Sequence, residues 1–386
     1  MALTSFAPLE EAYRDRHRAA LAWKRSGGKV IGCLGSDVPE ELVIAAGMLP
    51  VRIFGDPAGG DAMAERYEKG FHPQYRSQFT RLLDGTYSYL DRLLISNSSY
   101  IILEMFYTLD MIRETEPEMG VPEMYLYDCM LTPYRSSLMY NRDRLKELKE
   151  KLEEWRGAPI GEEEIREAVR IANENRRLLR QLNGLRLGTP RITGTQFLKA
   201  VTTSAIMDRK AHSGLLASIL REAAEAPAIE GAKLFVTGSI QDHPQFYELV
   251  ESCGAVIVGE DHDLGCRNYD SGIDESVGWI EGISDYYQFR TPSMNQSSVT
   301  ARVRALVNEV KRSGAEGVVF YIYRSDDPAL WEYPEERREL EARGIPTLVL
   351  ENQPYGLGEA EAAGLRERIQ AFIREKVRGG SVHERA

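Results

Sequence analysis

The feature that most constrains the fold of this chain is a short apolar run that ends in Gly-Ser and leads into a helical segment. It occurs twice, at 29–36 (KVIGCLGS) and at 233–239 (KLFVTGS). In both places a glycine, a second apolar run and an acidic turn follow. A short apolar run bounded by turn residues is typical of a buried strand, and strand, helix, strand with tight loops is typical of a parallel sheet. The pattern predicts an α/β protein with two similar doubly wound, Rossmann-like halves.

The rest of the chain supplies the other elements and the domain boundaries. We expect further strands at 49–54, 90–95, 123–127, 317–322 and 346–350, and helices at 8–25, 39–46, 74–84, 100–115 and 358–378. Two long segments, 138–155 and 161–183, carry apolar residues at helical spacing among many charges, which predicts exposed amphipathic helices. They divide the chain into an N-terminal α/β domain (1–135), a helical connecting segment (136–228) and a C-terminal α/β domain (229–386).

Charge and hydropathy exclude two classes of partner. The chain has 48 Lys+Arg against 59 Asp+Glu, a net charge of −11, whereas a general nucleic-acid binder carries a basic stripe that displaces counterions. No apolar run approaches the about 20 residues that span a bilayer. The segment 1–17 lacks the apolar core of a signal peptide, so the expected location is the cytoplasm.

The fold class predicts where a site lies. In open α/β sheets, ligands bind beyond the carboxyl ends of strands, where loops meet helix N-termini. This rule selects Gly35-Ser36, 96–99, Gly238-Ser239 and 324–327, and it makes the cleft between the halves the expected pocket. The sequence has no GxGxxG or GxxxxGK[ST] motif for a nucleotide, and no HExxH or GxSxG motif. The alternative for the two glycines is ordinary turn chemistry at a strand end.

Single residues in these loops also have plain structural interpretations. His72 precedes a helix, where a histidine more often caps or lies on the surface than binds a ligand. Asp326 suits an N-cap of the next helix, and Ser99 belongs to a loop that could serve only for capping. The functional interpretation therefore requires these residues to converge in space.

The cysteines exclude common cluster motifs. Cys33, Cys129, Cys253 and Cys266 form no CxxC pair, so neither a zinc ribbon nor a ferredoxin-type cluster is supported. Cysteines that are scattered in this way along a long cytosolic chain are most often reduced, buried and inert.

The segment 36–52 (SDVPEELVIAAGMLPVR) resembles the opening motif of the 2-hydroxyacyl-CoA dehydratase and benzoyl-CoA reductase subunits, the family of the 2-hydroxyglutaryl-CoA dehydratase D-component. The similarity continues at 76–78 (RSQ), 265–267 (GCR) and 290–292 (RTP) and spans nearly the whole chain. The resemblance implies a heterodimer of two related subunits with an acyl-CoA substrate. It also implies a [4Fe–4S] cluster held by three cysteines between two α/β domains, and an ATP-hydrolysing activator that supplies a low-potential electron.

The cysteine positions that the resemblance implies carry other residues here. They fall on His72, Ser99 and Asp326, and a further one falls on Ser293. Iron–sulfur clusters require thiolates because iron of this type prefers soft sulfur ligands. The sequence therefore departs from the family at the cluster and matches it in the scaffold.

Three hypotheses follow. In the first, this chain is the subunit without the cluster and completes the cleft of a dehydratase (lyase) or aryl-CoA reductase (oxidoreductase). A paralogous partner then carries the [4Fe–4S] cluster and an ATP-dependent activator serves it. Ser36, His72, Ser99 and Asp326 are the candidate catalytic residues, and Arg52, Arg267 and Arg324 are the candidate acyl-CoA-binding residues.

In the second hypothesis the chain is a stand-alone homologue, with His72, Ser99 and Asp326 in mononuclear-metal or acid/base chemistry. His72 and Asp326 would then be the ligands, although two protein ligands fall short of the usual three. In the third, the chain is a non-catalytic accessory protein.

Overall fold

The computed structural model describes residues 3–130, 132–293 and 297–378, and these residues form two four-stranded parallel sheets. The first has the order β2-β1-β3-β4, and the second the order β6-β5-β7-β8. In each half, the strand that comes first in the chain pairs with the second and the third strand. The two sheets therefore have the same topology, which confirms the two similar doubly wound halves. The strands are β1 (Val30–Leu34), β2 (Leu49–Arg52), β3 (Arg92–Ser96), β4 (Glu123–Tyr127), β5 (Ala232–Gly238), β6 (Ala255–Glu260), β7 (Gly317–Tyr323) and β8 (Thr347–Gln353).

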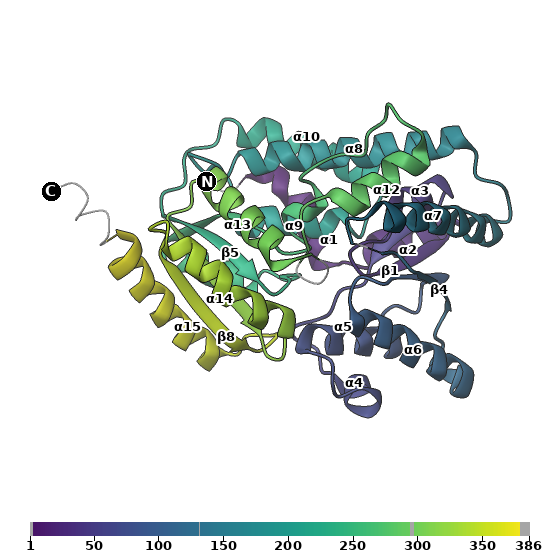
Figure 1. Cartoon of the computed structure of the whole chain (residues 1–386), viewed down its shortest axis with the longest axis horizontal. Coiled ribbons are helices and arrows are strands. Elements are labelled where there is room, and N and C mark those ends of the chain that lie inside the picture. Colours follow the sequence, from purple (N-terminus) through teal and green to yellow (C-terminus); the bar gives the residue numbers. More distant parts are fainter. Residues whose placement is uncertain (1–2, 131, 294–296, 379–386) are drawn as a thin grey trace.

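Helices connect the strands within each half (Figure 1). The first half contains α3 (Glu40–Ala45), α4 (Ala62–Tyr67), α5 (Pro73–Leu83) and α6 (Tyr100–Thr115). The second half contains α11 (Gln245–Ser252), α12 (Trp279–Phe289), α13 (Val299–Ser313), α14 (Asp327–Glu341) and α15 (Glu359–Phe372). Short 3₁₀ turns lie at Thr4–Phe6, Pro117–Met119 and Cys266–Asn268, and a π-helical turn follows α15 at Ile373–Arg378. No helix in the described part of the chain is both long and apolar enough to cross a bilayer.

Alternating side chains explain why both faces of each sheet are covered. In β1, Ile31 and Cys33 pack with α3 and α7 (Arg135–Arg156), whereas Val30 and Leu34 pack on the opposite face with α5 and α6. The side chains of β7 alternate in the same way. Val318 and Phe320 pack with α13 and α14, whereas Val319 and Tyr321 pack on the other face with α11 and α15. Successive strand residues point to opposite faces, so a strand that is apolar throughout requires helices on both sides.

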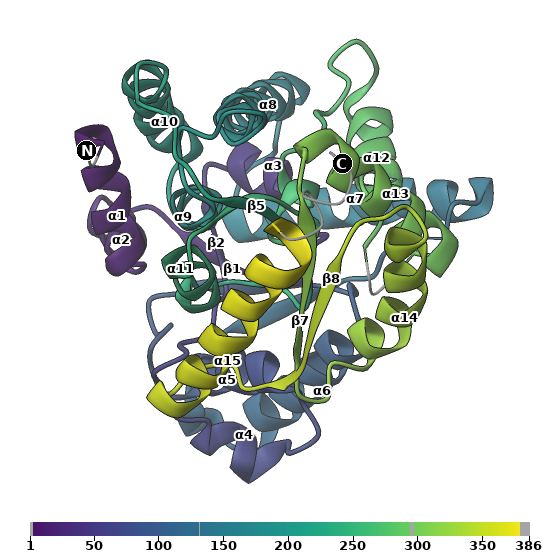
Figure 2. The ribbon, with the colours of Figure 1, turned by 90° about the vertical axis from the view of Figure 1, so that its left-hand side faces the viewer.

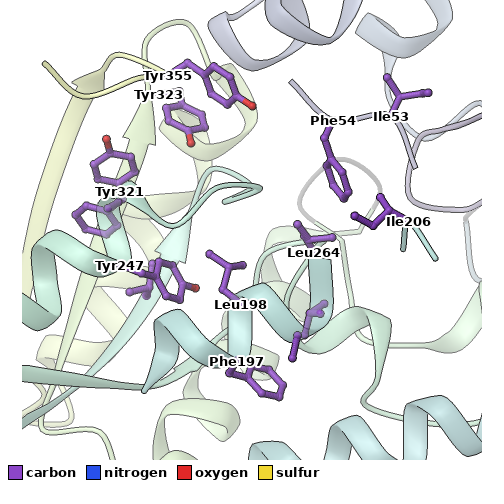
Figure 3. Close-up of a cluster of buried hydrophobic side chains, with 14 of the residues drawn as sticks. Ile53, Phe54, Phe197, Leu198, Ile206, Tyr247, Leu264, Tyr321, Tyr323 and Tyr355 are labelled. Carbon is purple, nitrogen blue, oxygen red and sulfur yellow. The ribbon is translucent and has the colours of Figure 1, made fainter. Parts of the chain in front are cut away.

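Four helices connect the halves in sequence: α7 (Arg135–Arg156), α8 (Glu162–Gly184), α9 (Gly194–Ser204) and α10 (Arg209–Ala223). Helix α8 packs on α3 of the first half, and α9 packs on β6 of the second. Helices α8, α9 and α10 contact one another, and Figure 2 shows α8 and α10 at the top of the view with α9 below them. One apolar cluster runs through both halves, and Figure 3 labels members from each, among them Phe54 after β2, Leu198 in α9 and Tyr247 in α11. The cleft between the sheets therefore lies over a continuous core.

The first predicted helix, 8–25, is wrong as a single element. The structure has α1 (Ala7–Arg14) and α2 (Arg18–Arg25), separated where Asp15 leaves the helical region at φ −111°, ψ 79°. Tertiary contacts account for the break, because Arg16 Nη2 donates to Asp242 O over 3.0 Å and His17 Nδ1 lies 3.0 Å from Tyr89 Oη. The helix predicted at 358–378 likewise ends as an α-helix at Phe372.

Candidate functional site

The topological switch point of the first sheet lies between β1 and β3, where connections leave in opposite directions. Gly35 ends β1 at φ +97°, and a Cβ at this position would lie 2.2 Å from Ser96 Oγ. Glycine meets both conditions without strain. The Ser36 amide donates to Ser98 Oγ over 3.1 Å. Hydroxyl groups at the end of β3 thus fix the backbone of the Gly-Ser pair.

The second sheet has an equivalent arrangement between β5 and β7. Gly238 has φ +103°, and a Cβ there would lie 2.5 Å from the Tyr321 carbonyl oxygen. Ser239 Oγ accepts from the Tyr323 amide over 2.8 Å and donates to the Asp326 carboxylate. Asp326 stands at the N-cap position of α14 as predicted, but its side chain does not cap the helix. It is bound to Ser239 instead.

The two switch points meet across the cleft. Asp263, in the loop after β6, accepts from Ser36 Oγ over 3.1 Å and from Ser293 Oγ over 3.0 Å. Two cavities of about 20 Å³ each lie here. The first is lined by His72, Asp263 and Asp326 among others, and the second by Ser36, Arg52 and Asp263.

Three of the predicted site residues converge around Tyr75, which sequence reasoning missed. His72 and Asp326 line the same cavity, and the ring of His72 lies 4.4 Å from that of Tyr75. The Tyr75 hydroxyl is hydrogen-bonded to Ser99, whose Oγ also accepts from the Ile102 amide over 3.3 Å. The capping role predicted for Ser99 is therefore confirmed.

His72 is buried, so it does not lie on the surface, which was one of its two plain structural interpretations. It occupies the N-cap position of α5 without a capping side-chain bond. Burial lowers the pKa of His72, and the nearby Asp326 opposes this only in part. The imidazole is therefore neutral near pH 7.

The three predicted arginines lie in different environments. Arg267 is buried, and it donates to Asp37 Oδ1 over 2.9 Å and to Thr291 O over 3.0 Å. Arg52 lines two cavities at the end of β2. Arg324 is exposed in the loop after β7. These residues do not form one cluster.

A buried ion-pair cluster fixes the loop after β1. Arg290 Nη2 donates to Asp37 Oδ1 over 2.6 Å, and Arg267 shares the same carboxylate. Burial alone would raise the pKa of Asp37, but the two guanidinium groups hold it well below its usual range. Asp37 and Arg290 belong to the segments 36–52 and 290–292, which resemble the family. This resemblance was the only feature of the sequence that could have pointed to either residue.

The donor set does not fit an iron–sulfur cluster. No cysteine lines the two cavities that His72, Ser36 and Asp326 border. Cys33, Cys129 and Cys266 are buried elsewhere, and burial raises the pKa of each thiol. Within residues 3–130, 132–293 and 297–378, no group of three or more His, Cys, Asp or Glu side chains could hold a metal ion. His72 and Asp326 therefore lack a third ligand of these types in the described chain.

A group of buried carboxyls stands behind the cleft. Arg302 lies 3.3 Å from Asp261, which lines the His72 cavity, 3.2 Å from Glu332 and 3.5 Å from Glu336. Burial raises the pKa of Glu332 to about 7 and that of Glu336 to about 8, against the opposing effect of Arg302. One guanidinium thus faces three carboxyls.

Because the folded state holds these protons after the unfolded chain has released them, the contribution of Glu332 and Glu336 to the free energy of unfolding should fall as pH rises from about 5 to about 8. We expect Glu336→Gln to remove part of this fall and to be more stable than wild type at the upper end by about 1–2 kcal/mol. Urea unfolding at several pH values measures both. The neighbouring, more exposed Glu335→Gln is the control, and an equal slope in Glu336→Gln and wild type would contradict the assignment.

Two parallel-sheet halves whose switch points meet in one cleft define a two-domain α/β protein with a candidate site between the domains. The family model described as "2-hydroxyglutaryl-CoA dehydratase, D-component" matches residues 35–375, and the chain belongs to this family.

Several relatives match over nearly full length. The (R)-phenyllactyl-CoA dehydratase beta subunit of Clostridium sporogenes is 25% identical over 354 residues, covering 90% of this chain and 92% of the relative. The beta subunit of (R)-2-hydroxyglutaryl-CoA dehydratase from Acidaminococcus fermentans is 25% identical, with coverage of 88% and 92%. A benzoyl-CoA reductase subunit of Thauera aromatica is 24% identical, with coverage of 95% and 96%. The resemblance inferred from the motifs is thus confirmed.

Proposed function

We propose that this chain is the subunit without a cluster in a complex of the 2-hydroxyacyl-CoA dehydratase and benzoyl-CoA reductase type, and that it completes the cleft for an acyl-CoA thioester. The observation that carries the proposal is the cavity at the paired switch points. Its lining includes His72 and Asp326 at positions where the family resemblance implies cysteines, and it has no thiol. Thiolate ligands hold iron–sulfur clusters, so the [4Fe–4S] cluster belongs to a paralogous partner subunit in the cytoplasm, served by an ATP-dependent activator.

The names of the relatives support a heteromer. Two of the matched proteins are named as beta subunits of dehydratases, and the third is named as one subunit of a reductase. Exposed apolar side chains also follow one face of α6, at Tyr100, Tyr107 and Met111. Exposed apolar side chains on one face of a helix suit a protein interface.

Within the cleft, the side chains supply polar groups of different character. Ser36 and Ser99 offer hydroxyls, and the neutral imidazole of His72 can donate or accept a hydrogen bond near the thioester. Asp326 is oriented by Ser239. The exposed Arg324 is suited to the phosphates of CoA, and Arg267 acts as a positioning residue through Asp37.

Anaerobic purification of the tagged full-length chain from its native host tests the proposal. We expect a second chain of the same family, with cysteines at the three positions, to co-purify, and the iron to stay with that chain after separation. The double variant His72→Ala/Asp326→Ala should leave the iron content of the complex unchanged and lower turnover of the acyl-CoA thioester at least about tenfold. Asp327→Ala, at the adjacent exposed position, is the matched control. An active homomer with stoichiometric iron would overturn the proposal.

A further inference from the structure

Gly35 and Ser36 also line a third cavity, whereas they do not line the His72 cavity. Its volume is about 50 Å³, and residues of β1, β2, α8, α9 and α12 line it. Gly35, Ser36 and Arg52 also border one of the smaller cavities, so the two spaces adjoin. The function proposed above makes no use of this larger cavity.

The charges around this cavity do not balance. Arg209 pairs with Glu40 and Arg176 pairs with Glu41, and both arginines line the cavity. The Asp37 carboxylate is shared by Arg267 and Arg290, and Asp263 lies 3.9 Å from Arg267. These four arginines are therefore balanced by four carboxylates. The positive charge of Arg52, which also lines the cavity, has no carboxylate to balance it.

Arg52 itself has no carboxylate partner. Among the described residues, the structure gives its side chain no ion pair, although Asp263 and Asp37 act on it at longer range. Burial lowers the pKa of Arg52, and so does the neighbouring Arg290. A guanidinium group stays protonated even so, and a half-buried cation without a counter-charge favours an anion beside it.

Two further donors in the lining are unsatisfied. Arg290 Nε and Tyr286 Oη are buried and have no hydrogen-bond partner among the described residues. The Arg290 side chain is 4% exposed and Tyr286 is 6% exposed. Buried polar groups in folded proteins nearly always have a partner, so an unsatisfied pair beside an unpaired cation indicates a missing acceptor.

We propose that this cavity is a binding site for one small carboxylate, held by Arg52 with Tyr286 and Arg290 as further donors. Its volume of about 50 Å³ is about three or four times the space that one water needs, which suits the three heavy atoms of a carboxylate better than the five of a phosphate. The planar fork of a guanidinium matches the two oxygens of a carboxylate in a bidentate pair. The carboxylate can come from a free short-chain acid or from the end of an acyl group that occupies the adjoining cavity.

Titration of the purified full-length chain with acetate at low ionic strength tests the proposal, with the rise in thermal unfolding temperature as the readout. We expect saturable stabilisation by acetate, and weaker stabilisation by phosphate at equal concentration. Arg52→Gln should weaken acetate binding about tenfold or more, and Arg52→Lys should restore part of it. Tyr286→Phe should weaken it a few-fold without loss of stability, because the hydroxyl has no protein partner.

Arg304→Gln is the matched control, because it removes the same charge from an exposed position. A comparison of succinyl-CoA with butyryl-CoA distinguishes the two sources. Tighter binding of succinyl-CoA that disappears in Arg52→Gln assigns the site to an acyl carboxylate, whereas equal binding of the two thioesters with Arg52-dependent acetate binding assigns it to a free acid. Equal stabilisation of wild type and Arg52→Gln by acetate, or stronger stabilisation by phosphate, would overturn the proposal.

Discussion

Replacing Asp37 by alanine should lower the free energy of unfolding by about 3–5 kcal/mol. Asp37 is 1% exposed and is the shared counter-charge of Arg267 and Arg290, whose side chains are each 4% exposed. Its removal leaves two guanidinium groups buried with fewer acceptors, and a buried charge without a partner costs far more than a lost surface ion pair. Urea unfolding of the full-length chain, with a constant m-value as the check on two-state behaviour, measures the loss.

The same contacts predict a pH dependence. The folded pKa of Asp37 lies below its unfolded value, so the stability that it contributes is present above the unfolded pKa and is lost as pH falls toward the folded pKa. The difference in stability between wild type and Asp37→Ala should therefore begin to shrink below about pH 4 and should go on shrinking as pH falls toward the folded pKa. The control is Asp285→Ala, which removes an exposed partner of Arg142 and should cost less than about 1 kcal/mol. A loss of similar size in both variants would contradict the role given to Asp37.

The division of the fold into two halves was predictable because the sequence features that indicate it are local. Gly35 and Gly238 end strands that are apolar on both faces, and the alternation of such strands with helices requires a parallel sheet covered on both sides. The switch points followed from the same rule. The helix 8–25 was mispredicted because contacts with Asp242 and Tyr89 break it, and local sequence does not encode those contacts.

The site was predictable only in part for the same reason. The family motif placed His72, Ser99 and Asp326 together, whereas their common neighbour Tyr75 has no distinguishing sequence signal. Asp37 and Arg267 are 230 residues apart, so no local pattern reveals their ion pair. The charge imbalance at Arg52 likewise depends on which arginines find carboxylates in space, and this is a property of the tertiary structure alone.

The switch points also predict which glycines tolerate a side chain. Gly254, Gly35 and Gly238 all have positive φ, at +86°, +97° and +103°, so alanine carries a similar backbone strain at each. A Cβ on Gly254 meets nothing within 4 Å, one on Gly35 meets the movable Ser96 Oγ at 2.2 Å, and one on Gly238 meets the Tyr321 carbonyl oxygen at 2.5 Å.

We therefore expect Gly254→Ala to cost about 1–2 kcal/mol, which is the strain of the left-handed backbone alone. Gly238→Ala should cost about 4 kcal/mol or more, because the backbone of β7 cannot move without breaking its pairing with β5. Gly35→Ala should fall between them, since a serine rotamer can change. Urea unfolding of the three variants gives the order directly. If Gly238→Ala is no less stable than Gly254→Ala, β5 and β7 do not approach each other at the switch point as closely as the structure requires. The position of Ser239 beside Asp326 would then need another explanation.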